Sequence, residues 1–178
     1  TRLNGGPMDY TPGIFVMDIA SFTDGNNTSW VNSTIAGQLA LYVTLYSPLQ
    51  MAADFPEHYE KFMDAFQFIK DVDLDWVQSR YLLAEPGDYV VIARQGKKDG
   101  QWFCGGVTDE QKRTLAVPMD FLEVGKVYEA TIYADAHDAD YKENPQGYKI
   151  WKQDVTSKDV LPMTMARGGG FAVSFIEK

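Results

Sequence analysis

The chain has 178 residues and a formal net charge of −9, and it is 45% hydrophobic and 13% aromatic. This much apolar surface supports a packed core and argues against a disordered chain. The lysines and arginines form no cluster, so a surface for nucleic-acid phosphates is not expected. The longest apolar run, near residues 39–45, is far shorter than the roughly 20 residues that a membrane-spanning helix needs.

The N-terminal segment reads as a loop followed by a helix. Residues 4–13, "NGGPMDYTPG", contain the glycines and prolines typical of turns. A helix is then expected to run to about Tyr46, with Asn32 or Ser33 as its cap. Its apolar stripe has helical spacing and comprises Ile35, Ala36, Leu39, Ala40 and Val43.

A second helix is predicted after a short break. Pro48 interrupts the first pattern, and residues 47–54 are expected to contain a short buried strand. Asp54 can then act as an N-cap, with Glu57 three residues later as in a capping box. The expected apolar face of this helix contains Tyr59, Phe62, Met63, Phe66 and Ile69.

From Asp73 onward the hydrophobic period changes from that of helices to that of strands. Eight short runs rich in β-branched and aromatic residues are separated by glycine-containing turns. The runs are 76–84, 88–95, 101–107, 113–121, 127–135, 148–155, 161–167 and 171–178. This pattern predicts an antiparallel sandwich or small barrel. The chain therefore divides into residues 1–71 and 72–178.

Two acidic clusters are candidate cation sites. Residues 71–75, "DVDLD", resemble the start of a calcium loop, but Trp76 and Leu82 stand where an EF-hand requires Gly and Glu. The entry to a half-buried strand is the favoured interpretation. For residues 135–147, a solvated loop is favoured and a loop-bound cation is the alternative.

The aromatic and histidine residues have similarly plain interpretations. Trp76, Trp102, Trp151 and Tyr148 are expected to pack in the core, with a sugar-stacking platform as the alternative. His58 and His137, the only histidines, are expected at the surface rather than as catalytic bases. The serine-hydrolase, zinc-peptidase and nucleotide-binding motifs are absent from the sequence.

Three blocks resemble glycoside hydrolase family 97, a family of α-glucosidases and α-galactosidases. They are "TRLNGGPMDYTPGIF", "AGQLALYVTLYSPLQMAADFPEHY" and the stretch "GDYVVIARQGKKDGQWFCGGVTDEQKRTLAVPMDFL" followed by "YEATIYADA". The resemblance implies an α+β fragment. Residues 1–71 would be the last β/α units of a (β/α)₈ barrel, and 72–178 an antiparallel C-terminal β-sandwich. The chain would then be part of a longer product.

The resemblance also defines which site residues to expect. The family's catalytic carboxylates and calcium-binding glutamates precede the motif with which this chain begins, so it implies no catalytic or metal residue here. Pocket-lining roles for an oligosaccharide fall to residues on two loops, since barrel active sites lie on such loops. These residues are Met8, Asp9, Tyr10, Thr11, Gln50 and Met51. A loop-shaping role competes for Asp9.

We therefore expect the complete enzyme to hydrolyse terminal α-glycosidic bonds. Calcium is expected in the complete enzyme and no cofactor in this chain. A periplasmic or secreted location follows from the same resemblance, and the upstream barrel is the expected partner. The alternatives are a purely structural domain and a carbohydrate-binding module. A binding module requires an exposed row of aromatics such as Trp102, Tyr148 and Trp151.

Overall fold

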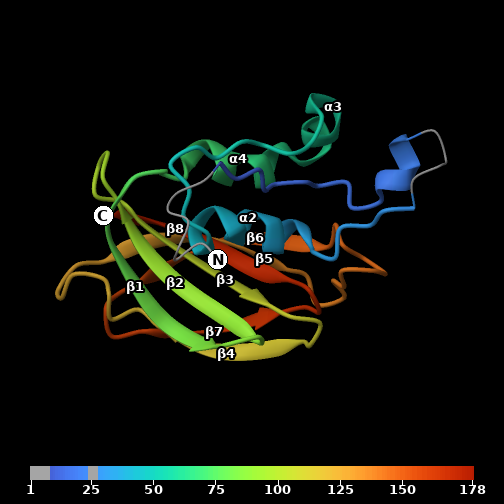
Figure 1. The fold of residues 1–178 in the computed structure, drawn as a ribbon. Coiled ribbons are helices and arrows are strands. Elements are labelled where there is room, and N and C mark those ends of the chain that lie inside the picture. Colours follow the sequence, from blue (N-terminus) through green and yellow to red (C-terminus); the bar gives the residue numbers. More distant parts are fainter. Residues whose placement is uncertain (1–8, 24–27) are drawn as a thin grey trace.

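The computed structural model describes residues 9–23 and 28–178. Short helices occupy the first part of the chain and strands the rest (Figure 1). The helices are η1 (Ile19–Phe22), α2 (Ile35–Thr44), α3 (Pro56–Tyr59), η2 (Glu60–Phe62) and α4 (Met63–Asp71). The strands are β1 (Trp76–Glu85), β2 (Tyr89–Gly96), β3 (Trp102–Thr108), β4 (Arg113–Pro118), β5 (Tyr128–Asp135), β6 (Tyr148–Val155), β7 (Val160–Met165) and β8 (Gly170–Glu177).

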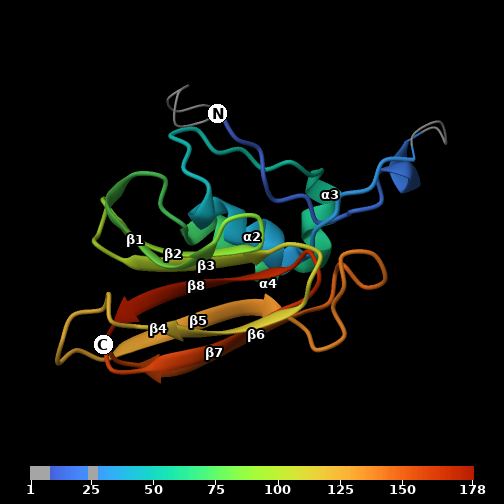
Figure 2. The ribbon, with the colours of Figure 1, turned by 60° about the horizontal axis from the view of Figure 1, so that its bottom comes forward.

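The strands form two antiparallel sheets. The larger sheet has six strands in the order β1-β2-β3-β8-β5-β6, and β4 pairs with β7 in a smaller one. Figures 1 and 2 show the helices on one face of the larger sheet and β4–β7 on its other face. All eight predicted strands are therefore confirmed, and they form an antiparallel β-sandwich. We call residues 73–178 the β-domain and residues 9–72 the helical layer.

The central strands of the six-stranded sheet are buried on both faces, because a separate hydrophobic core lies against each. Trp102 and Cys104 of β3 enter the core shared with β4 and β7, whereas Phe103 between them enters the core shared with the helices. Residues on successive positions of a strand point to opposite faces. Strand β3 is consequently buried at every position from 102 to 106 and shows no polar alternation.

Helix α2 lies close to the sheet because glycines face it. A Cβ added to Gly105 on β3 would lie 2.9 Å from the carbonyl oxygen of Ala40, and one added to Gly170 on β8 would lie 3.0 Å from the Cα of Gly37. The helix begins one or two residues later than predicted. Thr34 is its N-cap and accepts the Gly37 N–H at 3.0 Å, so the prediction of Asn32 or Ser33 as cap is wrong.

The second predicted helix is divided into α3, η2 and α4. The division falls at Phe62, whose φ of −138° and ψ of 40° are not helical. The N-cap of α3 is Phe55 and not Asp54 as predicted. The Asp54 carboxylate accepts the backbone N–H groups of Phe15 and Val16, at 2.7 and 2.9 Å, as well as that of Phe55. It therefore ties this segment to a distant part of the chain.

Candidate functional site

The residues predicted to line a pocket come from two segments that lie side by side. Tyr10 and Gln50 form a parallel β-bridge, and hydrogen bonds join Tyr10 N–H to the Leu49 carbonyl at 3.0 Å and Met51 N–H to the Tyr10 carbonyl at 2.9 Å. The structure thus brings Asp9, Tyr10 and Thr11 close to Gln50 and Met51 in the chain's fold. Met8 lies outside the described residues.

The segment 47–54 differs from the short buried strand that was expected. It forms a single bridge, and the side chains of Leu49 and Met51 are 54% and 41% exposed. Asp9 and Thr11 are exposed as well, and Tyr10 and Gln50 are half-buried. The paired segments therefore present their side chains to an open surface in this chain.

The side chain of Gln50 is engaged with the end of a helix. Its Nε2 donates to the carbonyl oxygens of Tyr42 and Leu45, both at 3.2 Å, and these are among the last carbonyls of α2. Its Oε1 is buried without a hydrogen-bond partner among the described residues. The last carbonyls of a helix lack hydrogen-bond donors within the helix, and the Gln50 side-chain amide donates to two of them.

Two buried tyrosines and a glutamine fix the backbone of both segments. The Tyr42 hydroxyl lies 3.1 Å from the carbonyl of Pro12 and 2.9 Å from that of Met51, and burial raises its pKa. The Tyr59 hydroxyl donates to the Gly13 carbonyl at 2.7 Å. Gln38 accepts the Gly13 N–H at 3.0 Å. The sequence interpretation missed these contacts. The only signal for them in the sequence is that these three residues carry polar atoms on predicted helix faces that are otherwise largely apolar.

Asp54 and His58 form a side-chain pair next to the same segments. His58 Nδ1 bonds to Asp54 Oδ1, and only 16% of the His58 side chain is exposed, so the prediction of a surface histidine is wrong there. Burial alone would raise the pKa of Asp54, but hydrogen bonds from Val16, His58, Phe15 and Phe55 outweigh it and hold the pKa below its usual range. The carboxylate is occupied by these donors, so we assign it a structural role.

The acidic clusters are structural too. Residues 71–75 end α4 and lead into β1, where the Asp73 carboxylate accepts the N–H groups of Leu74 and Lys98 at 2.8 and 3.0 Å. In the second cluster His137 is almost fully exposed, as predicted. Within residues 9–23 and 28–178, no group of three or more His, Cys, Asp or Glu side chains is arranged to hold a metal ion.

Asp135 is buried, although residues 135–147 are predicted to form a solvated loop. It is only 4% exposed and accepts hydrogen bonds from the Thr34 hydroxyl at 2.6 Å and from the Ala166 and Gly170 N–H groups at 2.7 and 2.8 Å. Burial raises the pKa of Asp135 to about 6, against the lowering effect of these bonds. Asp135 joins the N-cap of α2 to the turn between β7 and β8.

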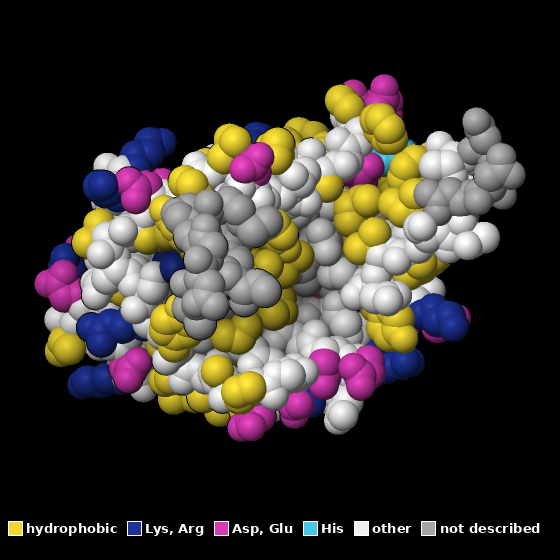
Figure 3. Space-filling view, in the orientation of Figure 1, with side chains coloured by type: hydrophobic (Ala, Val, Ile, Leu, Met, Phe, Trp, Pro, Cys, Tyr) yellow, Lys and Arg dark blue, Asp and Glu magenta, His cyan; other side chains and the backbone are white. Residues whose placement is uncertain are grey.

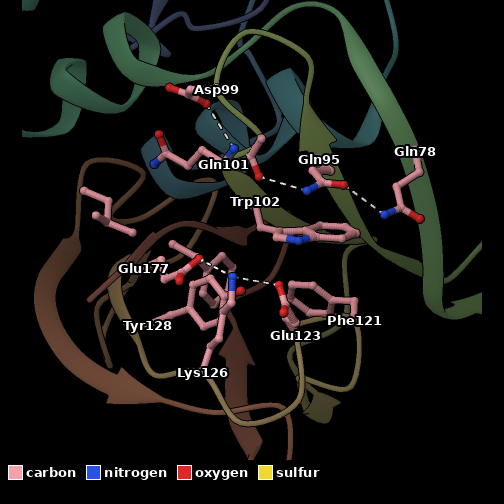
Figure 4. A pocket seen from close by; sticks show the side chains of 13 residues that line it. Gln78, Gln95, Asp99, Gln101, Trp102, Phe121, Glu123, Lys126, Tyr128 and Glu177 are labelled. Carbon is pink, nitrogen blue, oxygen red and sulfur yellow. Dashed lines mark hydrogen bonds and ion pairs between the residues drawn. The ribbon is translucent and has the colours of Figure 1, made fainter.

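The aromatic residues of the β-domain confirm core packing. Trp102 is only 5% exposed, Trp151 packs against the same core, and Tyr148 and Trp76 pack against the core beneath the helices. Tyr148 and Trp151 lie on opposite faces of β6, so they cannot form one row. Trp102 does line a pocket at the end of the sheet, together with residues of several strands and loops (Figure 4). Sequence reasoning did not identify this pocket.

The structure defines the class of protein as an antiparallel β-sandwich domain covered on one sheet by a helical layer. A family model described as "Glycosyl-hydrolase 97 C-terminal, oligomerisation" matches residues 75–176, which is most of the β-domain. The chain therefore belongs to glycoside hydrolase family 97. No helix of the described residues has the length and apolar character needed to cross a membrane.

Similar proteins match nearly the whole chain. A retaining alpha-galactosidase of Bacteroides thetaiotaomicron is 33% identical over 97% of this chain and 25% of its own length. A probable retaining alpha-galactosidase of Streptomyces bingchenggensis is 30% identical, over 97% of this chain and 24% of its own length. The chain thus spans about a quarter of these relatives.

Solved structures agree with this assignment. A family 97 enzyme from Pseudoalteromonas sp. strain K8 in complex with acarbose is 47% identical, with a TM-score of 0.92 over 99% of this chain and 27% of that one. A point variant of that enzyme has been solved in complex with panose. A beta-arabinopyranosidase has a TM-score of 0.76 at 19% identity over 95% of this chain and 25% of its own, which shows a shared fold alone.

Proposed function

We propose that this chain is the C-terminal part of a longer family 97 enzyme that hydrolyses terminal α-glycosidic bonds of α-glucosides or α-galactosides. The observation that carries this proposal is the parallel pairing of Tyr10 with Gln50 on either side of helix α2. Parallel neighbours require a crossover connection, most often a helix, and the (β/α)₈ barrel repeats this unit. The helical layer would then be the last β/α units of the catalytic barrel.

In this arrangement the helical layer contributes to the substrate pocket without supplying the chemistry. Barrel active sites form on the loops at the C-terminal ends of the strands. Met8, Asp9, Tyr10, Thr11, Gln50 and Met51 would line the pocket, with Gln50 acting through its backbone because its amide binds the end of α2. The paired carboxylates that glycosidases use would belong to the preceding part of the enzyme.

Exposed apolar residues support a partner for the helical layer. Six large apolar side chains of this layer are 37–55% exposed: Trp30, Tyr46, Leu49, Met51, Phe55 and Met63. Figure 3 shows hydrophobic side chains gathered over this layer, with charged ones mostly around the edge of the view. Exposed apolar side chains that gather on one face mark interaction sites. We assign it to contact with the preceding barrel of the complete enzyme.

Calcium, location and assembly belong to the same proposal. We propose from the family resemblance that calcium binds in the preceding part of the complete enzyme; the described residues contain no group of three or more His, Cys, Asp or Glu side chains that could hold a metal ion. A periplasmic or secreted location is proposed from the family resemblance, and fractionation of producing cells tests it.

The name of the matching family model supports self-association through the β-domain. Sedimentation of the 178-residue chain over a range of concentrations tests that role.

The central experiment compares this chain with the product of the complete gene. Both are assayed on p-nitrophenyl α-glucoside and α-galactoside, with calcium and with a chelator. Turnover by the complete product and none by the 178-residue chain is the expected result. Turnover by this chain alone would overturn the proposal, because it would place the catalytic groups within the described domain.

A further inference from the structure

A pocket of about 550 Å³ opens at one end of the sandwich, where β3 and β5 begin and β8 ends (Figure 4). Its volume lies within the roughly 300–1,000 Å³ of small-molecule sites. The pocket is formed by parts of the chain that are distant in sequence, including the β2–β3 hairpin and the loop between β4 and β5. It belongs to the β-domain and is separate from the paired segments of the helical layer.

The deep side of the pocket is aromatic. Trp102, Phe121, Tyr128 and Phe175 line it, and all four are at most 8% exposed. The Trp102 and Phe121 rings have their centroids 5.0 Å apart, and those of Phe121 and Phe175 are 5.4 Å apart. These rings pack against one another and fix the shape of the wall. Because so little of each ring is exposed, the wall offers no open stacking face and acts as the apolar boundary of the pocket.

Two of these aromatic residues carry unused polar groups. Among the described residues, neither the indole N–H of Trp102 nor the hydroxyl of Tyr128 has a hydrogen-bond partner, and neither is sealed from solvent as the indole N–H of Trp76 is. Figure 4 shows the Trp102 indole lying across the pocket. Both groups are accessible to solvent in the pocket, so a polar ligand can bond to them in place of water.

The mouth of the pocket adds donors and acceptors of both kinds. Lys126 lies between Glu123 and Glu177, at 2.8 and 2.9 Å. Gln78 donates to Gln95 at 2.9 Å, and Gln95 in turn donates to the Gly100 carbonyl at 3.0 Å. The side-chain amide of Gln101, also in the lining, has no hydrogen bond to another described residue, while its backbone N–H donates to Asp99 at 3.0 Å. Lys126 is the one cation that pairs with the two glutamates, and Asp99 also lines the pocket, so the mouth is net negative and rich in hydrogen-bonding groups.

From this arrangement we infer that the pocket binds a neutral saccharide of one or two sugar units. Sugar hydroxyls both donate and accept, which matches carboxylates, amides, an indole N–H and a phenol in one place. An anionic ligand would meet two glutamates, the Asp99 carboxylate and a chain of net charge −9. The inference goes beyond the proposed function, because the pocket contains no catalytic arrangement and its binding does not depend on hydrolysis.

Titration of the 178-residue chain tests the inference directly. Maltose and methyl α-galactoside are added while tryptophan fluorescence is recorded, and calorimetry is run in parallel. Spermine and inorganic phosphate serve as charged probes. Trp102→Phe removes the indole N–H but keeps an aromatic ring, and Gln101→Ala changes a half-buried residue at the mouth. Trp151→Phe is the matched control, because its indole N–H is bonded to Gln153 at 3.0 Å outside the pocket.

We expect saturable binding of at least one sugar and none of phosphate. A lost hydrogen bond is worth about 1 kcal/mol, so Trp102→Phe and Gln101→Ala should each weaken binding about fivefold. Trp151→Phe should leave it unchanged, and thermal melts establish that each variant folds. No saturation by either sugar, tighter binding of spermine, or equal binding by Gln101→Ala and the wild type would overturn the inference. Hydrolysis by the complete gene product is a separate readout, so failure of either proposal is recognised independently.

Discussion

The helical layer and the β-domain are held together in different ways. Every strand of the β-domain pairs with a neighbour through an antiparallel backbone ladder. The described part of the helical layer has isolated bridges at Tyr10–Gln50 and Asp18–Trp30 and depends on side chains that bind distant backbone groups. Asp54, Tyr42, Gln38 and Tyr59 make these contacts.

This difference indicates which part is self-sufficient. The β-domain buries one core between its own two sheets, and that core contains no residue of the helices. The second core exists only where the helical layer meets the sheet, through residues such as Phe103 and Tyr133. The helical layer therefore depends on the β-domain for its core. Its exposed apolar side chains suit a further partner on the opposite side.

Substitution of Gly105 should weaken the contact between the β-domain and the helical layer more than any other change proposed here. The Cβ of any other residue would lie 2.9 Å from both the Ala40 carbonyl oxygen and the Val43 Cβ. Gly105→Val is expected to lower the free energy of unfolding by about 3 kcal/mol, because overpacking displaces α2 from the sheet. Urea unfolding followed by circular dichroism measures this. Ala116→Val on the exposed side of β4 is the control, and an equal loss there would contradict the explanation.

The buried carboxylate of Asp135 should give the junction a pH dependence. Its pKa of about 6 lies above the unfolded value of about 3.9, so the folded state holds the proton more tightly between these values. Stability is therefore expected to fall as the pH rises from about 4 to about 6. The slope is at most about 1.4 kcal/mol per pH unit.

Asp135→Asn isolates this effect. The amide can keep accepting the Ala166 and Gly170 N–H groups through its oxygen and can donate to the Thr34 hydroxyl. The variant should remove the slope between pH 4 and 6 and be at least as stable as the wild type at pH 7. Thermal melts at several pH values test this. An unchanged slope in the variant would assign the pH dependence to other groups.

Asp54 should show the opposite dependence in the helical layer. Its pKa is lowered on folding, so its stabilising contribution is present above the unfolded value of about 3.9 and is lost as the pH falls through the folded value. Asp54→Ala leaves the N–H groups of Phe15 and Val16 without their acceptor and should cost about 2 kcal/mol at pH 7. The variant should also lose less stability than the wild type on acidification below pH 4. Equal acid sensitivity would contradict this role.

The strands were predictable because their signals are local. Alternation and turn glycines such as Gly87, which has a φ of +92°, mark each strand within about ten residues of sequence. The helix boundaries were not, because distant partners decide them. Thr34 becomes the cap where Asp135 accepts its hydroxyl, and Asp54 binds Phe15 and Val16 instead of capping α3. Local patterns contain no information about such partners.

The candidate sites follow the same division. The family resemblance placed Tyr10 on one pocket loop and Gln50 after the next strand. The structure shows that these segments form a bridge, while their role toward a substrate stays a prediction. The pocket at Trp102 was not foreseen, although Trp102 was considered for sugar binding as part of an exposed row. Its lining comes from strands and loops that meet only in the folded domain. Periodicity places Trp102 in the core and does not show that one edge of its ring reaches a pocket.

Substitution of Leu49 should have the smallest effect on the stability of this chain. Its effect should be larger in the complete enzyme. Leu49 is 54% exposed, so Leu49→Gln should change the stability of the 178-residue chain by less than about 0.5 kcal/mol. If the preceding barrel covers this residue, the same substitution buries a polar amide there and should lower the melting temperature of the complete enzyme by several degrees. Val124→Ser, at a site 79% exposed in the β-domain, should be neutral in both proteins.

Melting curves decide the matter, with each substitution made in both the 178-residue chain and the complete enzyme and compared with the wild type. Equal, small shifts for Leu49→Gln in both proteins would mean that this surface stays open, and the helical layer would then need no partner beyond the β-domain.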